Sequence, residues 1–128
     1  MQMNNLYLLL RRPFFYRFFT WLLVHAPFLI PVKRLRETKA LLAFAHPQPE
    51  YAFHVIIVPR KQVASFADLD PADPFLPDLV TSVHSLVAEN QLTAYRLIVN
   101  GGEYQDIPHL HFHLISGASH VYRPISDI

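Results

Sequence analysis

Apolar residues recur at two different spacings along the chain, and these spacings predict the main elements. Between residues 74 and 90 they fall three and four positions apart, which is the spacing of an amphipathic helix. Five short stretches, separated by Pro, Gly or polar turns, have the apolar and β-branched character of strands. They are 33–37, 40–45, 53–58, 95–100 and 109–116. The order of strands, one helix and further strands predicts an α+β domain on a largely antiparallel sheet.

The beginning of the chain is an aromatic and apolar arm over residues 6–32. It holds eight of the seventeen aromatic residues of the protein. Pro13 suits the first turn of a helix, because the N–H that it lacks has no helical partner there. Pro27 and Pro31 would end a helix. The arm therefore predicts a helix at about 14–25.

Three interpretations of this arm remain open. It packs on the rest of the chain or on a second copy, it anchors the protein to a membrane, or it is a processed targeting segment. The twenty residues from Pro13 to Val32 are about long enough to cross a bilayer, but they include Arg17. We divide the chain into an arm, residues 1–31, and a domain, residues 32–128. We expect a cytoplasmic protein for which a membrane surface is a candidate partner of the arm.

Composition narrows the classes of function. The 128 residues include no cysteine, which excludes a disulfide framework, a thiolate metal site and a cysteine nucleophile. The net charge of +1 gives no reason to expect a nucleic-acid partner. The charge is unevenly placed, because residues 1–36 carry six bases and no acid, while the rest of the chain carries five bases and ten acids. Such asymmetry indicates that the arm has a task of its own.

Three of the eight histidines stand at positions 109, 111 and 113. Alternate side chains of a strand share a face, so the three imidazoles should line one face and Leu110, Phe112 and Leu114 the other. The apolar face should pack on the helix and the histidine face should line a cleft. Two chemistries use such a row. One is a metal site, to which Asp106 and His54 would contribute; the other is attack on phosphorus by a neutral imidazole.

These residues resemble the signature of the histidine-triad (HIT) family, which is His-x-His-x-His followed by two apolar residues, at 109–115. Asn100-Gly101-Gly102 lies upstream, and Gln105 falls four residues before the first triad histidine, where the family carries glutamine. The stretch from Leu42 through two prolines to His54, and then Val58-Pro59-Arg60, is similar to a strand–turn–strand of that family. The resemblance covers roughly residues 32–117.

The resemblance implies a five-stranded antiparallel sheet with one main helix, a homodimer in most branches, and binding of a purine nucleotide or nucleotide conjugate. It implies that His111 attacks the α-phosphorus, forming a nucleotidyl-histidine that water then hydrolyses. His109 would supply the backbone carbonyl that holds the ring N–H of His111. His113 and His54 would surround the phosphate and brace the triad. No metal and no cofactor are required.

The resemblance assigns further residues to the substrate. Gln105 would hydrogen-bond phosphate oxygens or the bridging atom, and Asn100 would contact the ribose or the phosphate. His46 and Asp106 also fall in the expected binding region, but both depart from the pattern of the family. A histidine that the family carries is absent or displaced by one residue to His46, and such a shift would turn it to the other face of a strand. Asp106 replaces a serine or threonine.

These departures keep two alternatives open beside a HIT-type phosphoramidase or dinucleoside polyphosphate hydrolase. One is a nucleotide-binding module without catalysis, because Asp106 would repel a phosphate and Ala45 stands where the family often has histidine. The other is a metal-dependent enzyme that uses the three strand histidines.

Overall fold

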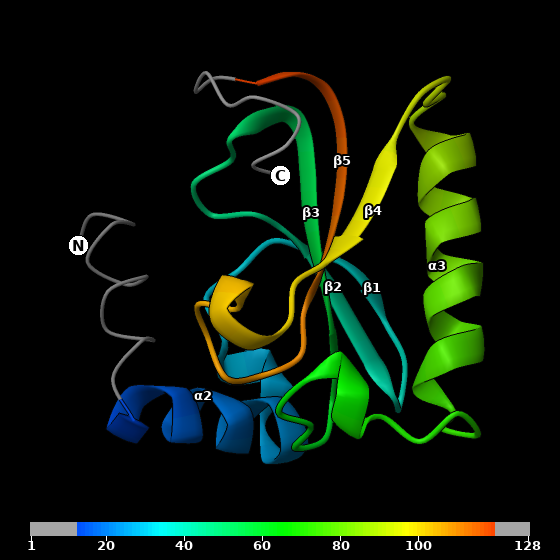
Figure 1. Cartoon of the computed structure of the whole chain (residues 1–128). Helices are drawn as coiled ribbons and strands as arrows, with labels where there is room; N and C mark the ends of the chain where they lie inside the picture. Colours follow the sequence, from blue (N-terminus) through cyan, green and yellow to red (C-terminus); the bar gives the residue numbers. More distant parts are fainter. Residues whose placement is uncertain (1–12, 120–128) are drawn as a thin grey trace.

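The computed structural model describes residues 13–119, which form a five-stranded sheet between two helices (Figure 1). The strands have the order β1-β2-β3-β5-β4, and all neighbours are antiparallel. The fold class and sheet predicted from the sequence are confirmed. In chain order, the elements are α2 (Pro13–His25), η1 (Pro27–Leu29), β1 (Arg34–Glu37), β2 (Leu41–Ala45), β3 (Tyr51–Pro59), η2 (Phe66–Asp68), α3 (Phe75–Glu89), β4 (Arg96–Val99), η3 (Gly102–Tyr104) and β5 (Phe112–Ser119).

One face of the sheet packs against α3. Residues of β3 alternate between the two faces, and Val55 and Ile57 point to this side, where they share a core with Phe112 and Leu114 of β5. Of the positions that the helical spacing predicts, Leu79, Val83 and Leu86 are buried in this core, whereas Val80 is exposed. Phe75, at the start of the helix, is buried there as well. Asp73 marks the start of the helix, because its side chain accepts a hydrogen bond of 2.9 Å from the N–H of Phe75.

The opposite face of the sheet is covered by α2 and the turn after it. Leu23 of α2 and Ile30 are buried in a second core with Leu42, Phe44, Ile56 and Val58 of the sheet. The helix expected at about 14–25 is therefore present as Pro13–His25, and it packs on the sheet of its own chain. Leu23 and Ile30 of the arm share one core with the strands. The division of the chain into an arm, 1–31, and a domain, 32–128, therefore stays a prediction.

The histidines of β3 and β5 lie on the same face as α2. In the β3–β5 pairing, His54 lies opposite Ile115 and Ile56 opposite His113, so His54 and His113 share the side of the sheet that Ile56 faces. We call this side the histidine face. It is distinct from the α3 face, as the alternation of residues 110–114 predicts.

The last strand begins later than the sequence predicts. The expected strand covers 109–116, whereas β5 covers Phe112–Ser119. The N–H of His109 donates to the carbonyl of Ile107, and the N–H of Leu110 donates to the carbonyl of Val63, which lies beyond the end of β3. The backbone at 109–110 is thus paired with a loop, and the ladder with β3 and β4 begins at Phe112.

Among the described residues, no helix is both long enough and apolar enough to cross a bilayer. The 13 residues of α2 fall well short of the roughly twenty that a spanning helix needs. The residues of the arm before Pro13 lie outside the described part of the chain.

The buried position of Leu23 predicts that the arm stabilises the fold. Leu23→Ala should lower the free energy of unfolding by about 2–5 kcal/mol, because it leaves a cavity between α2 and the sheet. Urea unfolding followed by circular dichroism measures this change. Leu29→Ala is the matched control, since Leu29 is 60% exposed and its truncation should change stability by no more than about 0.5 kcal/mol. Equal effects of the two substitutions would show that α2 is not part of the core.

Candidate active site

Four imidazole rings gather on the histidine face. The ring of His54 lies 4.3 Å from that of His46 and 5.2 Å from that of His113, measured between centroids. The ring of His111 lies 5.3 Å from that of His113. They come from the turn after β2, from β3, from β5 and from the residue just before β5. Segments far apart in the sequence thus build one cluster.

The orientation of His111 is fixed by a backbone carbonyl. Nδ1 of His111 lies 2.8 Å from the carbonyl oxygen of His109. Because a carbonyl oxygen only accepts, Nδ1 carries the proton and donates it. In the neutral ring Nε2 then holds a lone pair, which is the state that a nucleophile or a proton acceptor requires. His111 is half-buried, so its ring is neither sealed in the core nor fully in solvent.

His54 and His113 are joined in a relay of hydrogen bonds that sets their proton positions. The backbone N–H of Glu50 donates to Nδ1 of His54 at 3.1 Å. In neutral His54 the proton is therefore on Nε2, which lies 2.9 Å from Nδ1 of His113 and donates to it. Neutral His113 then carries its own proton on Nε2. This order makes His113 a hydrogen-bond donor beside His111.

His46 belongs to the cluster, so the expectation that a displacement by one residue turns it away is wrong. Alternation along β2 puts Leu42 and Phe44 on the histidine face, and position 46, two residues beyond Phe44, falls on the same side. β2 ends at Ala45, and the N–H of His46 donates to the carbonyl of His54 in the turn. Its Nδ1 accepts from the N–H of Gln48. Burial, and then the charge of His111, lower the pKa of His46 to about 4.

The ring of His109 does not join those of His111 and His113 in the cluster, which corrects the expectation from strand alternation. It is 2% exposed. Its Nε2 lies 3.2 Å from the carbonyl oxygen of Pro59 at the end of β3, and its Nδ1 lies 3.1 Å from Oγ1 of Thr20 on α2. Burial lowers the pKa of His109 to about 4, so the ring is neutral near pH 7. Its side chain is a buried link between elements, and only its carbonyl reaches His111.

Sequence reasoning did not find Thr20. A single threonine in an aromatic and aliphatic helix carries no motif and is 89 residues from its partner. The one available signal was its polarity within an otherwise apolar turn, because a buried hydroxyl needs a hydrogen-bond partner.

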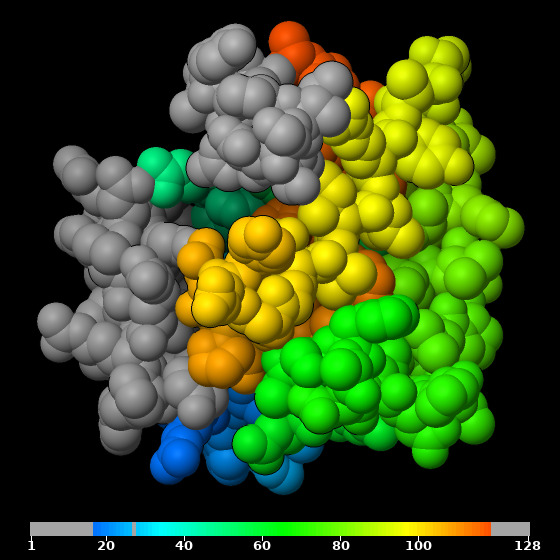
Figure 2. All heavy atoms as spheres, in the orientation of Figure 1, coloured from blue at the N-terminus to red at the C-terminus, as the bar shows by residue number. Residues whose placement is uncertain are grey.

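The loop after β4 carries the other expected site residues, and it lies at the centre of the face seen in Figure 2, in yellow to orange. The amide nitrogen of Gln105 donates to the carbonyls of Ala64 at 2.6 Å and Ile107 at 3.0 Å. Within residues 13–119, neither His109 nor His111 is bonded to Gln105. Its donor is therefore engaged by the backbone in this conformation.

Asn100 and Asp106 stand at the two ends of that loop. Val99 pairs with Phe112, so continuing the register by one residue sets Asn100 opposite His111. Asp106 is exposed, three residues before His109. The register thus predicts that Asn100 lies beside His111, whereas Asp106 is exposed.

The described residues do not include a group of three or more His, Asp or Glu side chains placed to hold a metal ion. The hydrogen bond between His54 and His113 occupies Nε2 of the first ring and Nδ1 of the second.

Comparison with known proteins agrees with this architecture. The HIT domain model matches residues 29–120. The chain is 35% identical over 88 residues to adenosine 5′-monophosphoramidase of Saccharomyces cerevisiae, covering 67% of this chain and 54% of that protein, and so spans about half its length. An uncharacterized HIT-like protein of Synechococcus elongatus is 29% identical over 99 residues, covering 74% of this chain and 87% of that one.

A crystal structure of a HIT family hydrolase from Legionella pneumophila superimposes with a TM-score of 0.67 at 29% identity, covering 75% of this chain and 90% of that one. Residues 29–120, which the HIT domain model matches, contain the five strands of the sheet, α3 and the four clustered histidines. The chain therefore belongs to the HIT family.

Proposed function

We propose that this protein is a nucleotide-binding hydrolase or transferase that acts at the α-phosphorus of a purine nucleoside phosphate derivative. The observation that carries the proposal is the hydrogen bond from Nδ1 of His111 to the carbonyl of His109, because it leaves the lone pair on Nε2. The yeast relative, named a monophosphoramidase, and the Legionella neighbour, named a hydrolase, support the reaction class.

The first step of the proposed reaction forms a bond between Nε2 of His111 and the α-phosphorus. The bond from phosphorus to the leaving group breaks, and the leaving group departs with the electron pair and takes up a proton. The proton on Nε2 of neutral His113 is suited to donate to phosphate oxygens as charge develops there. Preorganised donors of this kind are usually the largest contribution to such catalysis.

The second step releases the nucleotide. Water, or another acceptor in a transferase, forms a bond to phosphorus and loses a proton. The bond to Nε2 breaks, and its electron pair returns to the ring of His111. Neither step removes the proton from Nδ1 of His111, so the carbonyl of His109 keeps its hydrogen-bond donor and the orientation of the ring.

A nucleotide-binding module without turnover is the second candidate, and one observation favours it. The donor of Gln105 is held by the carbonyls of Ala64 and Ile107, so it must rotate before it can reach a phosphate. Asp106 adds a negative charge to the same loop. Binding with no turnover would identify this alternative.

We also propose a homodimer, as the resemblance implies. The edge strand β4 leaves Leu97 42% exposed, and the neighbouring Tyr95 is 51% exposed. Val80 of α3 is 52% exposed. Apolar side chains at a sheet edge and on the adjacent helix are suited to a second copy of the chain, and light scattering at several protein concentrations distinguishes dimer from monomer.

A membrane surface is the proposed partner of the outer side of α2. Phe18 and Trp21 are each 53% exposed, and in the following turn Phe28 is 72% and Leu29 60% exposed. Such aromatic and aliphatic groups insert at the level of lipid headgroups. The six bases and absence of acids in residues 1–36 favour an anionic surface, at about 1 kcal/mol for each base close to it.

The nucleophile is tested by His111→Ala. This substitution should lower kcat on adenosine 5′-monophosphoramidate by at least about 10³-fold, because the covalent route is lost. Binding of the nucleotide product, measured by calorimetry, should persist. His84→Ala is the control, since His84 is exposed on α3, and it should keep full activity. Unchanged turnover in His111→Ala, or turnover that a chelator abolishes, would contradict the proposal and favour the metal-dependent alternative.

The membrane partner is tested by co-sedimentation with vesicles. The full chain should sediment with vesicles that contain phosphatidylserine and less with neutral ones, and the double substitution Phe18→Ser and Trp21→Ser should reduce binding by roughly tenfold or more, since two large apolar contacts are lost. Tyr104→Ser, which removes an exposed aromatic side chain outside both α2 and the proposed dimer contact, should leave binding unchanged. Equal recovery of all forms in the supernatant would reject a lipid partner.

A further inference from the structure

Helix α2 contacts His109, the residue whose carbonyl accepts from His111, through one buried side chain. Oγ1 of Thr20 lies 3.1 Å from Nδ1 of His109, and Thr20 is 6% and His109 2% exposed. Among the side chains of α2 that the structure describes, the others that pack on the sheet are apolar, as Leu23 is. Thr20 adds a hydrogen bond, which fixes direction as well as distance, to these apolar contacts.

The direction of this hydrogen bond follows from the second ring nitrogen. Nε2 of His109 faces the carbonyl oxygen of Pro59, which only accepts, so Nε2 carries the proton. In a neutral ring Nδ1 is then an acceptor, and the hydroxyl of Thr20 must be the donor. The pKa of His109, lowered to about 4 by burial, agrees with a neutral ring.

The two bonds hold the ring of His109 from opposite sides, one from α2 and one from the end of β3. The carbonyl of the same residue accepts the N–H of His111 at 2.8 Å. The contacts form a chain that runs from Thr20 through His109 to His111. Catalysis is sensitive to shifts well below 1 Å in the position of a reacting group, so the anchoring of His109 bears on His111.

We propose that Thr20 is a positioning residue for His111: its hydroxyl fixes the ring of His109 and thereby the carbonyl that orients the nucleophile. This inference rests on the function proposed above for His111. In this role α2 positions a residue of the site in addition to covering one face of the sheet. Thr20 itself has no contact with the nucleophile and acts only through His109.

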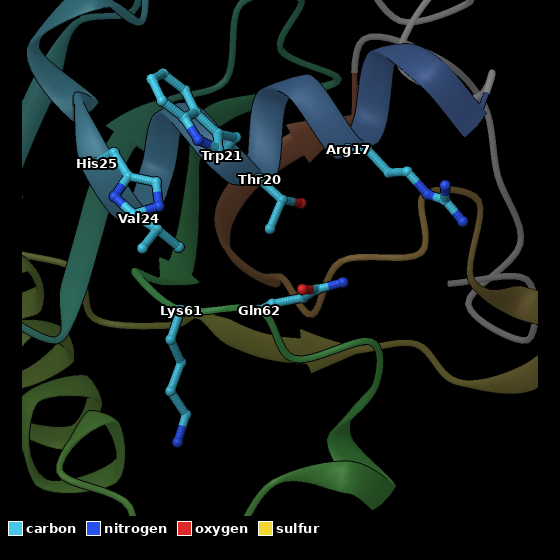
Figure 3. A pocket seen from close by; sticks show the side chains of 7 residues that line it. All are labelled: Arg17, Thr20, Trp21, Val24, His25, Lys61 and Gln62. Atoms are coloured by element: carbon cyan, nitrogen blue, oxygen red, sulfur yellow. The ribbon is translucent and has the colours of Figure 1, made fainter.

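The surroundings of Thr20 decide which substitution tests this role. It lines a cavity of about 390 Å³ between α2 and the segment after β3, together with Val24, Lys61 and Gln62 (Figure 3). In Figure 3 Thr20 points from the helix toward the Gln62 side of this space, while Lys61 turns away. With alanine at position 20, a water from the cavity has room to replace the hydroxyl. Valine fills the same volume as threonine and brings no donor.

Thr20→Val should therefore lower kcat by about two- to tenfold and leave KM unchanged, because a single neutral hydrogen bond is lost away from the nucleotide. Thr20→Ser, which restores the donor, should recover most of the rate. The control is Val24→Thr, the reverse exchange one turn further along α2 at another wall of the cavity, and it should leave kcat unchanged.

A readout on His109 separates this role from simple packing. In long-range ¹H–¹⁵N NMR spectra of the unaltered protein, Nδ1 of His109 should show the shift of an acceptor in a hydrogen bond, and Nε2 should carry the proton. Thr20→Val should move the Nδ1 resonance toward the value of an unbonded acceptor, and Thr20→Ser should return it.

Several results would overturn the inference. They are an unbonded Nδ1 in the unaltered protein, a kcat unchanged by Thr20→Val, a rise in KM alone, or an equal loss of rate in Val24→Thr. The spectrum of the unaltered protein decides the case even where Thr20→Val does not fold. Failure of the proposed function is recognised separately. A fully active His111→Ala would show that His111 is not the nucleophile, while the hydrogen bond between Thr20 and His109 would still be seen in the spectra.

Discussion

The hydrogen bond between Nδ1 of His111 and the carbonyl of His109 is the constraint on which the site depends. It fixes the proton on one nitrogen of His111, the proposed nucleophile, and leaves the other nitrogen with a lone pair. A similar constraint fixes the proton positions of His54 and His113. The backbone N–H of Glu50, just before β3, donates to Nδ1 of His54 and so determines which nitrogen of each ring holds a proton. Both constraints come from backbone groups. The fold itself therefore determines which nitrogen carries the proton in neutral His54, His111 and His113.

That backbone is held by two layers of different character. The α3 face is a conventional apolar core, and its helix shows no bond to the four clustered histidines among the described contacts. The histidine face is shared between an apolar region under α2 and the imidazole cluster, and His109 lies where the two meet. Helix α2 therefore packs against the residue whose carbonyl accepts from His111. The same helix exposes Phe18 and Trp21 on its outer side, which places the proposed lipid contact and the site on opposite sides of one element.

Local patterns in the sequence predict much of this arrangement. The spacing of three and four finds α3, and the alternation at 110–114 correctly separates apolar residues from His111 and His113. It fails at His109, because β5 starts only at Phe112 and the ring is captured by Thr20 and Pro59 from distant parts of the chain. At His46 the alternation of β2 holds, because Leu42 and Phe44 face the same side as its ring. The expectation that fails there is that a displacement by one residue from the family pattern turns the ring away. Periodicity holds within an element, whereas contacts at the ends of elements are set by tertiary packing.

The central claim is that the fold leaves Nε2 of His111 unprotonated and ready to attack phosphorus. The most direct test is the tautomer of His111 in the unliganded protein at a pH where its ring is neutral, read from the two-bond ¹H–¹⁵N couplings of the imidazole. The account predicts a proton on Nδ1 and an unprotonated Nε2, in keeping with the 2.8 Å contact to the carbonyl of His109. A neutral His111 with its proton on Nε2 would contradict it.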